Sequence, residues 1–317
     1  MRITYFFILF LISSLGFSQP SVSVFQRLLN TNNIAIRNDA CKKAAQFQYV
    51  FVAGIFNELM PYYFKDYHDW LVNCHVPEKN ILIARPYSGA GLSRASTSLK
   101  DSIAQMSSQS PTKPIILVGH SKGAPEALLA SLESSPEVQG KIAAVVSIQG
   151  SFGGSPIADL ALTYSDNRSN LKDRILVRVA RQLALWLKRV EVAYGKPMTE
   201  GVDSVRTQES RQFWTQYLKN HSSSVILTEN KLLVLQTFKH YRRLNPFFFL
   251  SGEYLDRITG ERTDGAIPFS SQRPPLNNLT TAVLELDHLD TVLPSTFSFS
   301  SADVRYHLIA SIIEAIE

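Results

Sequence analysis

Residues 115–125 read Ile-Ile-Leu-Val-Gly-His-Ser-Lys-Gly-Ala-Pro. The apolar run Ile115–Val118 predicts a short buried strand. Pro125 suits the first turn of a helix, because the N–H that proline lacks would have no partner there. Between them lies the pattern Gly-x-Ser-x-Gly, with Ser121 at its centre. After a strand and before a helix, this pattern predicts a tight turn that strains the serine backbone and presents its hydroxyl.

The turn around Ser121 also predicts chemistry. We expect side chains at Gly119 and Gly123 to collide with neighbouring elements, which explains the two glycines. The following helix would direct its N-terminus at the reacting carbon, where its dipole favours developing negative charge. The same pattern occurs in turns without chemistry, but the flanking strand and helix favour Ser121 as a nucleophile. Because serine is a weak nucleophile at neutral pH, a His and an Asp or Glu should follow it in the chain.

His288 is the predicted base. It follows the apolar run Ala282–Leu286, in the loop after the last predicted strand. Loops at the carboxyl ends of parallel strands are where such sheets carry their sites. Among the other histidines, His120 lies within the turn and should point into neighbouring structure, while His307 falls inside a predicted terminal helix. His68 and His75 precede the serine, on the wrong side for the order Ser, Asp, His.

Asp264 is the predicted acid. It occupies an Asp-Gly turn beyond a predicted strand at residues 246–250, and its carboxylate could orient the imidazole. Glu253 and Asp256 are alternatives on the same predicted loop. Asp287 adjoins His288, but adjacent residues rarely place their side chains to bond each other in this way. A surface turn without chemistry is the alternative for any Asp-Gly pair.

Two backbone amides are predicted to stabilise the oxyanion, each contributing roughly 3 kcal/mol. One belongs to Lys122, directly after the nucleophile. The other is expected in the segment Val52–Glu58, after the first strand, where we favour the amide of Ile55 over that of Phe56. A strand end with a simple glycine turn is the alternative. The Lys122 side chain places a positive charge beside the nucleophile unless it turns away.

Short apolar runs alternate with helical patterns along the chain and predict an α/β fold, with a mostly parallel central sheet flanked by helices. The predicted strands span residues 49–53, 81–84, 115–118, 142–148, 246–250 and 282–286. Predicted helices span residues 94–106 and 125–132. A terminal helix carries an apolar stripe of Leu308, Ile309, Ile312, Ile313 and Ile316. We expect one domain over residues 19–317.

A segment of about residues 156–230 is too long for a simple crossover between strands. Within it, residues 171–190 read LKDRILVRVARQLALWLKRV, which predicts an amphipathic basic helix. The predicted apolar face comprises Ile175, Val179, Leu183, Trp186 and Leu187. We interpret the segment as an inserted helical cap or lid. A helix packed permanently on the sheet is the alternative.

The N-terminus resembles a secretory signal peptide over residues 1–18. A short positive start at Met1-Arg2 precedes the apolar run Tyr5–Phe17, and small residues suit cleavage after Ser18. The alternative is a membrane anchor, but the run is shorter than the roughly 20 residues that span a bilayer. We therefore expect a secreted or periplasmic protein.

Charge and cysteine content add weaker constraints. The formal net charge is +5 and the sequence pI about 9.1, which can indicate an anionic partner. Lys and Arg are spread along the chain, so we do not expect nucleic-acid binding. The two cysteines, Cys41 and Cys74, could pair in an oxidising compartment or remain as buried thiols. No Cys and His spacing predicts a metal site.

Together these motifs resemble the lipase branch of the α/β-hydrolase superfamily, in particular secreted bacterial triacylglycerol lipases. The sequence GHSKG at Gly119–Gly123 resembles their nucleophile turn, and Ser147–Asp159 resembles the segment after their next strand. Thr263–Pro268 resembles their acid loop, and His288–Asp290 their base loop. The likeness spans about residues 49–293, with the motifs in the same order.

The resemblance implies hydrolysis of a carboxylic ester through an acyl-serine intermediate, on lipid or other apolar esters, with transient contact of the cap with a lipid surface. It favours a long acyl chain, as do the 18 Phe and 12 Tyr residues. Alternatives are an amidase, peptidase or acyltransferase with the same triad, or a non-catalytic secreted binding protein.

Two features bear on how far the resemblance extends. Ala53-Gly54 stands where many such lipases have His-Gly. Asp290 occupies the place of a ligand to the structural calcium that many of them carry, but no partner carboxylate is evident. We therefore expect no cofactor, with calcium as the alternative.

Overall fold

The computed structural model describes residues 23–31, 34–166, 174–221, 231–277, 279–296, 298 and 300–316. The predicted signal peptide, residues 1–18, lies outside the described residues, as do parts of the predicted cap. Within the described residues, no helix combines the length and apolarity needed to cross a membrane.

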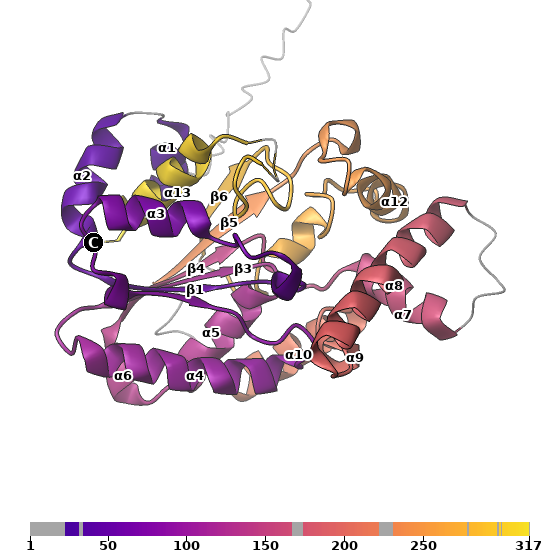
Figure 1. Ribbon diagram of the computed structural model, residues 1–317, viewed down its shortest axis with the longest axis horizontal. Helices are drawn as coiled ribbons and strands as arrows, with labels where there is room; N and C mark the ends of the chain where they lie inside the picture. Colours follow the sequence, from indigo (N-terminus) through magenta and orange to yellow (C-terminus); the bar gives the residue numbers. More distant parts are fainter. Residues whose placement is uncertain are drawn as a thin grey trace, which may run out of the picture.

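A six-stranded sheet forms the centre of the molecule, and each of its pairings is parallel (Figure 1). The strand order is β2-β1-β3-β4-β5-β6. The strands are β1 (Gln48–Val52), β2 (Ile81–Ala84), β3 (Ile115–His120), β4 (Ile142–Ile148), β5 (Leu232–Thr237) and β6 (Thr280–Leu284). β1, β3 and β5 are buried along their whole length, as continuous apolar runs in a parallel sheet should be. The predicted parallel sheet is confirmed.

One predicted strand is wrong. Residues 246–250 are not in the sheet: they lead into helix α12 (Phe249–Thr259), and the strand at this place is β5, at Leu232–Thr237. Both runs are short and apolar, so periodicity does not distinguish a buried strand from a helix start. Phe247 and Phe248 line a pocket instead of extending the sheet.

Helices cover both faces of the sheet, as Figure 1 shows. One face carries α1 (Val24–Asn30), α2 (Ile34–Ala44), α3 (Lys65–Asn73) and α13 (Ala302–Glu314); the other carries α4 (Leu92–Gln109), α5 (Gly123–Glu133) and α6 (Pro136–Lys141). Because successive strand residues point to opposite faces, Tyr49 and Phe51 pack into one apolar core while Val50 and Val52 pack into the other. Short 3-10 helices lie at Asn57–Leu59, Glu78–Asn80, Tyr241–Arg243 and Phe269–Gln272.

Cys41 and Cys74 form a disulfide, with their Cα atoms 5.0 Å apart. Cys41 lies in α2 and Cys74 directly follows α3, so the bond joins two helices that share one face of the sheet. The sequence left open whether these cysteines pair or remain as buried thiols, and in the structure they are paired. The bond closes a loop with a sequence separation of 33 residues, which removes freedom from the unfolded chain.

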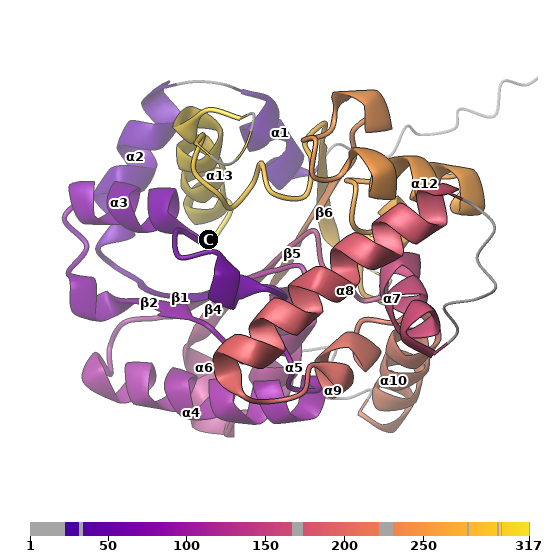
Figure 2. The ribbon, with the colours of Figure 1, turned by 45° about the vertical axis from the view of Figure 1, so that its right-hand side comes forward.

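Four described helices lie between β4 and β5, within the segment predicted as an inserted cap. They are α7 (Pro156–Asp166), α8 (Arg174–Tyr194), α9 (Thr199–Asp203) and α10 (Thr207–Asn220). α8 runs diagonally across the front of the molecule in Figure 2. Val179, Ala180 and Val190 of α8 are buried while Arg178 and Arg181 are exposed, so its apolar face packs inward.

Candidate active site

The turn from β3 into α5 holds Ser121 in a left-handed conformation, with φ at 56°. A non-glycine residue in this region is strained, and such strain marks functional turns. A Cβ added at Gly119 would lie 2.4 Å from the carbonyl oxygen of Gly123, and one at Gly123 would lie 2.3 Å from that of Val52. Only glycine fits both positions, so the turn has the close approaches that its sequence predicts.

Asp264 and His288 lie side by side, as predicted. His288 donates from Nδ1 to Asp264 Oδ2 at 2.7 Å, and its backbone N–H donates to the Asp264 carbonyl at 2.9 Å. The other carboxylate oxygen, Oδ1, accepts from the amides of Ala266 at 2.9 Å and Ile267 at 2.8 Å. Asp264 is fully buried and His288 nearly so. These bonds fix both the position of the carboxylate and the orientation of the imidazole.

The alternative acids lie elsewhere. Glu253 and Asp256 are part of α12. Asp287 holds the backbone of the base loop: its Oδ1 accepts from the amides of Leu289 and Asp290, both at 3.0 Å. Among these four carboxylates, it is Asp264 that bonds to the imidazole of His288.

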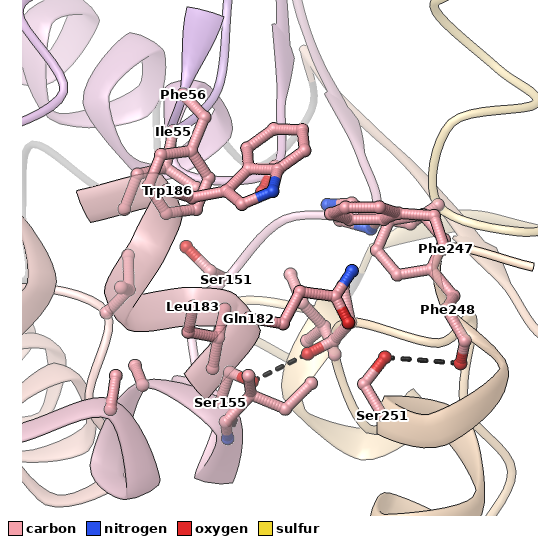
Figure 3. Close-up of a pocket in the computed structure, with 18 of the residues that line it drawn as sticks. Ile55, Phe56, Ser151, Ser155, Gln182, Leu183, Trp186, Phe247, Phe248 and Ser251 are labelled. Carbon is pink, nitrogen blue, oxygen red and sulfur yellow. Dashed lines mark hydrogen bonds between the residues drawn. The ribbon is translucent and has the colours of Figure 1, made fainter. Parts of the chain in front are cut away.

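Ser121 and His288 line the same pocket, which has a volume of about 130 Å³ (Figure 3). Most of its lining is apolar and comes from the loop after β1, from α7 and α8, and from residues 247–248. The lining includes Ile55, Phe56, Ile157, Val179, Leu183, Trp186, Leu187, Phe247 and Phe248. The ring of Trp186 packs against Phe56 and Phe247, with centroids 5.6 Å and 4.6 Å apart. α8 therefore contributes directly to the wall above the serine.

The loop after β1 lies against Ser121, since a Cβ at Gly54 would be 2.8 Å from Ser121 Cβ. The amide of Phe56 already donates to Ser88 Oγ at 2.8 Å. The amides of Ile55 and Lys122 have no acceptor among the described residues. Of the two candidate amides in this loop, Ile55 is therefore the one available for an oxyanion.

The Lys122 side chain turns away from the site. Its ammonium donates to Glu126, one helical turn further along α5, and both side chains are buried. Burial raises the pKa of Glu126, while the charge of Lys122 opposes that shift. The positive charge after the nucleophile is thus neutralised within α5.

His120 takes part in a buried hydrogen-bond chain that the sequence did not reveal. Its Nε2 lies 2.9 Å from two acceptors, the His288 carbonyl and Gln149 Oε1, so Nε2 carries the proton. Nδ1 then accepts from the Tyr63 hydroxyl at 2.6 Å, which in turn accepts from the Gly54 amide at 3.1 Å. These hydrogen bonds connect the loop after β1 to the loop that carries His288.

Burial, reinforced by the adjacent His288, holds the pKa of His120 well below its usual range. A neutral ring suits the chain, because Nδ1 must accept from Tyr63. From the sequence, His120 was expected to point into neighbouring structure, but its partners could not be predicted because they come from segments far apart along the chain.

The base loop contains a buried carboxylate pair, Asp287 and Asp290. Lys239 lies over it, with Nζ 2.9 Å from Asp290 Oδ2 and 3.9 Å from Asp287 Oδ2. Burial and the charge of Asp290 raise the pKa of Asp287. Calcium requires several oxygen ligands, yet within the described residues no group of acidic or histidine side chains is placed to hold a metal. With the Lys239 ammonium at Asp290, these residues do not fit calcium.

Comparison with known proteins supports the fold. A model of the lecithin:cholesterol acyltransferase family matches residues 25–187, just over half of the chain. No curated protein gives a significant match. Among solved structures, a metagenomic carboxyl esterase has a TM-score of 0.58 at 18% identity, covering 85% of this chain and 76% of its own. The mature form of a Bacillus licheniformis lipase has a TM-score of 0.51 at 19% identity, covering 77% and 85%. The predicted α/β-hydrolase fold is confirmed.

Proposed function

Since this chain belongs to the lecithin:cholesterol acyltransferase family, we propose that it is a serine carboxylic-ester hydrolase acting on lipid or other apolar esters. The observation that carries the proposal is the buried bond of 2.7 Å between His288 Nδ1 and Asp264, beside the pocket that also holds the strained Ser121. The apolar wall of this pocket suits an acyl chain.

In the proposed first half-reaction, the Ser121 hydroxyl attacks the ester carbonyl carbon. Since Nδ1 of His288 carries a proton bound by Asp264, Nε2 is the basic nitrogen and takes the serine proton. The carbonyl oxygen becomes an oxyanion, which the amides of Ile55 and Lys122 stabilise. Asp264 stabilises the imidazolium without taking its proton. The imidazolium then protonates the leaving alcohol, and Ser121 remains acylated.

In the second half-reaction, water gives a proton to His288 and attacks the acyl-serine carbonyl. The same two amides bind the second oxyanion. Collapse of this intermediate breaks the bond to Ser121 Oγ, which recovers its proton from His288, and releases the carboxylic acid. The arrangement thus carries out both halves with one base.

Acyl transfer is the second candidate, and the family match favours it. In that reaction an alcohol replaces water in the second half-reaction, and the product is a new ester. Both candidates use the same Ser121, Asp264 and His288, so they differ only in what reaches the acylated serine.

We also propose that the protein is exported and that its cap contacts a lipid surface. The signal-peptide pattern in residues 1–18 supports export. Contact of the cap with a lipid surface is supported by α8, where Leu185 and Val192 are exposed beside basic residues such as Arg181, Lys188 and Arg189. Exposed apolar side chains flanked by Lys and Arg favour binding at a membrane interface.

Nitrophenyl esters of increasing acyl length test the enzymatic proposal. We expect turnover by the wild type, loss of at least about 1000-fold in Ser121→Ala, and a maximum beyond the acetate ester. No turnover by the wild type, or equal turnover by the two proteins, would refute catalysis by Ser121. A maximum at acetate would leave an esterase but contradict a preference for longer acyl chains.

A further inference from the structure

Gly54 lets the loop after β1 lie close to the nucleophile turn, but it leaves the backbone there free to rotate. A Cβ at this position would lie 2.8 Å from Ser121 Cβ and 2.8 Å from the Tyr63 hydroxyl, so the close approach requires glycine. Glycine has the fewest steric limits on its backbone angles. The peptide group between Gly54 and Ile55, which carries the Ile55 N–H, therefore meets little steric resistance to rotation on its Gly54 side. Another group must fix the direction of this N–H.

The Asn57 side chain holds that peptide group. Its Nδ2 donates to the Gly54 carbonyl at 3.0 Å and to the Pro86 carbonyl at 2.8 Å. Because both partners are carbonyls, the side-chain amide must present its nitrogen to them. Asn57 is only 1% exposed, which shields these bonds from water. The bond to Pro86, in the loop after β2, anchors the side chain to a second segment.

The shape of a peptide group converts this bond into a direction for the Ile55 N–H. No peptide bond among the described residues is cis, and in a planar trans peptide group the C=O and the N–H point in opposite directions. A Gly54 carbonyl held toward Asn57 therefore directs the Ile55 N–H away from Asn57. Ile55 lines the pocket that holds Ser121, whereas Asn57 does not (Figure 3).

The next peptide group along the loop is fixed as well. Phe56 has a left-handed backbone, with φ at 63°, which is unfavourable for a residue with a side chain. Its N–H donates to Ser88 Oγ at 2.8 Å. Ser88 donates in turn to Glu58, from its hydroxyl to Oε2 at 2.5 Å and from its backbone N–H to Oε1 at 2.7 Å. Both peptide groups that flank Ile55 are thus held by buried side chains.

We propose that Asn57 is a positioning residue, which holds the Gly54–Ile55 peptide group so that the Ile55 N–H is directed at the oxyanion. This inference rests on the proposed function. Asn57 acts through the backbone, without touching the substrate. The close approach to Ser121 requires glycine at position 54, and Asn57 removes the backbone freedom that this glycine introduces.

Asn57→Leu tests the inference, because leucine has the same branched shape and no hydrogen-bond donor. Asn80→Leu is the matched control: Asn80 is also 1% exposed and accepts from Ser110 Oγ, but it precedes β2, at the opposite end of the strands from Ser121. Both variants lose a buried hydrogen bond, so both should have a lower Tm.

The two variants should differ in their kinetics on a nitrophenyl ester. Removing one oxyanion donor lowers kcat by about 100- to 1000-fold. In Asn57→Leu the donor is misdirected rather than removed, so we expect kcat to fall at least about 10-fold, with KM within about 2-fold of the wild type. Asn80→Leu should keep the wild-type kcat.

A pair of inhibitors separates binding of the oxyanion from binding of the chain. An alkyl trifluoromethyl ketone is attacked by Ser121 Oγ at its carbonyl carbon, the serine proton passes to His288, and the ketone oxygen becomes an oxyanion. The alcohol with the same chain, in which CHOH replaces the carbonyl, cannot be attacked. We expect Asn57→Leu to raise the Ki of the ketone at least about 10-fold and to leave the Ki of the alcohol unchanged.

A wild-type kcat and ketone Ki in Asn57→Leu, or equal losses of affinity for ketone and alcohol, would overturn the inference while leaving the hydrolase intact. The same fall of kcat in Asn80→Leu would also overturn it, because loss of any buried asparagine would then suffice. Asn57→Asp keeps the shape of the side chain without its N–H donors, and it provides the same test if Asn57→Leu does not fold. A wild type that neither turns over esters nor binds the ketone more tightly than the alcohol would refute the proposed function as well.

Discussion

Lowering the pH below 6.5 should destabilise this protein through His120. Burial and the adjacent His288 hold the pKa of His120 well below the ordinary value of 6.5, so the folded protein keeps the ring neutral while the unfolded chain takes up a proton. Where the unfolded state binds more protons, stability rises with pH. The stabilising contribution of a neutral His120 is therefore present above pH 6.5 and is lost as the pH falls.

The size of this destabilisation follows from the one proton that the unfolded chain binds at His120. If the folded protein takes up no proton at His120 over this range, linkage at a single site gives a loss of about 2 kcal/mol in the free energy of unfolding between pH 8 and about pH 5. Glu126 and Asp287 have raised pKa values, so their protonation on acidification stabilises the folded state. Comparing the wild type with a variant that lacks His120 separates the contribution of His120 from those of Glu126 and Asp287.

His120→Gln removes the titrating group and retains a polar side chain. Urea unfolding of the wild type and the variant, at a series of pH values between 5 and 8, gives the free energy of unfolding of each. We expect the variant to be less stable at pH 8 and its deficit to shrink by about 2 kcal/mol on acidification to about pH 5. A constant difference across this range would refute the claim that His120 stays neutral in the fold.

Three further changes have defined outcomes. Cys41→Ser should lower the free energy of unfolding by about 4 kcal/mol, because a loop with a separation of 33 residues is released. Urea unfolding measures this loss, and reduction of the disulfide in the wild type should reproduce it. Lys239→Met removes the ammonium from beside two buried carboxylates and should cost about 3–5 kcal/mol, with calcium failing to restore the lost Tm. Trp186→Ala removes the ring packed over the pocket and should shift the best nitrophenyl ester to a longer acyl chain; an unchanged profile would contradict the role of α8 as a pocket wall.

The parts of the site that the sequence predicted are those encoded within short segments. The turn around Ser121 needs a buried run, two glycines and a helix start, and all of them lie within residues 115–125. His288 follows β6, as its prediction required. Asp264 was placed after a strand at residues 246–250 that does not exist, yet it still lies between β5 and β6 because its order along the chain was right. The single wrong strand, at residues 246–250, shows the limit of this reasoning, since a short apolar run fits a strand or a helix start equally well.

The contacts that the sequence did not predict are those between distant segments. Tyr63 and Lys239 lie in loops without a motif, and Gln149 lies in the segment Ser147–Asp159 but had no predicted role. Each acquires its role only when the sheet order brings these loops to one edge. Among the described residues, the buried hydroxyls of Ser147, Ser151 and Ser311 have no hydrogen-bond partner. The sequence does not predict which serines are unpaired, because this depends on the complete set of neighbours.

The hydrogen bonds around His120 link the two loops on which catalysis would depend. The Gly54 amide, which precedes that of Ile55, is held by Tyr63, and the carbonyl of His288 is held by His120. A shift of the base loop would therefore strain the oxyanion loop through bonds of 2.6–3.1 Å. Trp186 of α8 packs on Phe56, the residue after Ile55. α8 therefore contacts the loop that carries the Ile55 amide, so the pocket wall and the predicted oxyanion amide are joined by direct packing.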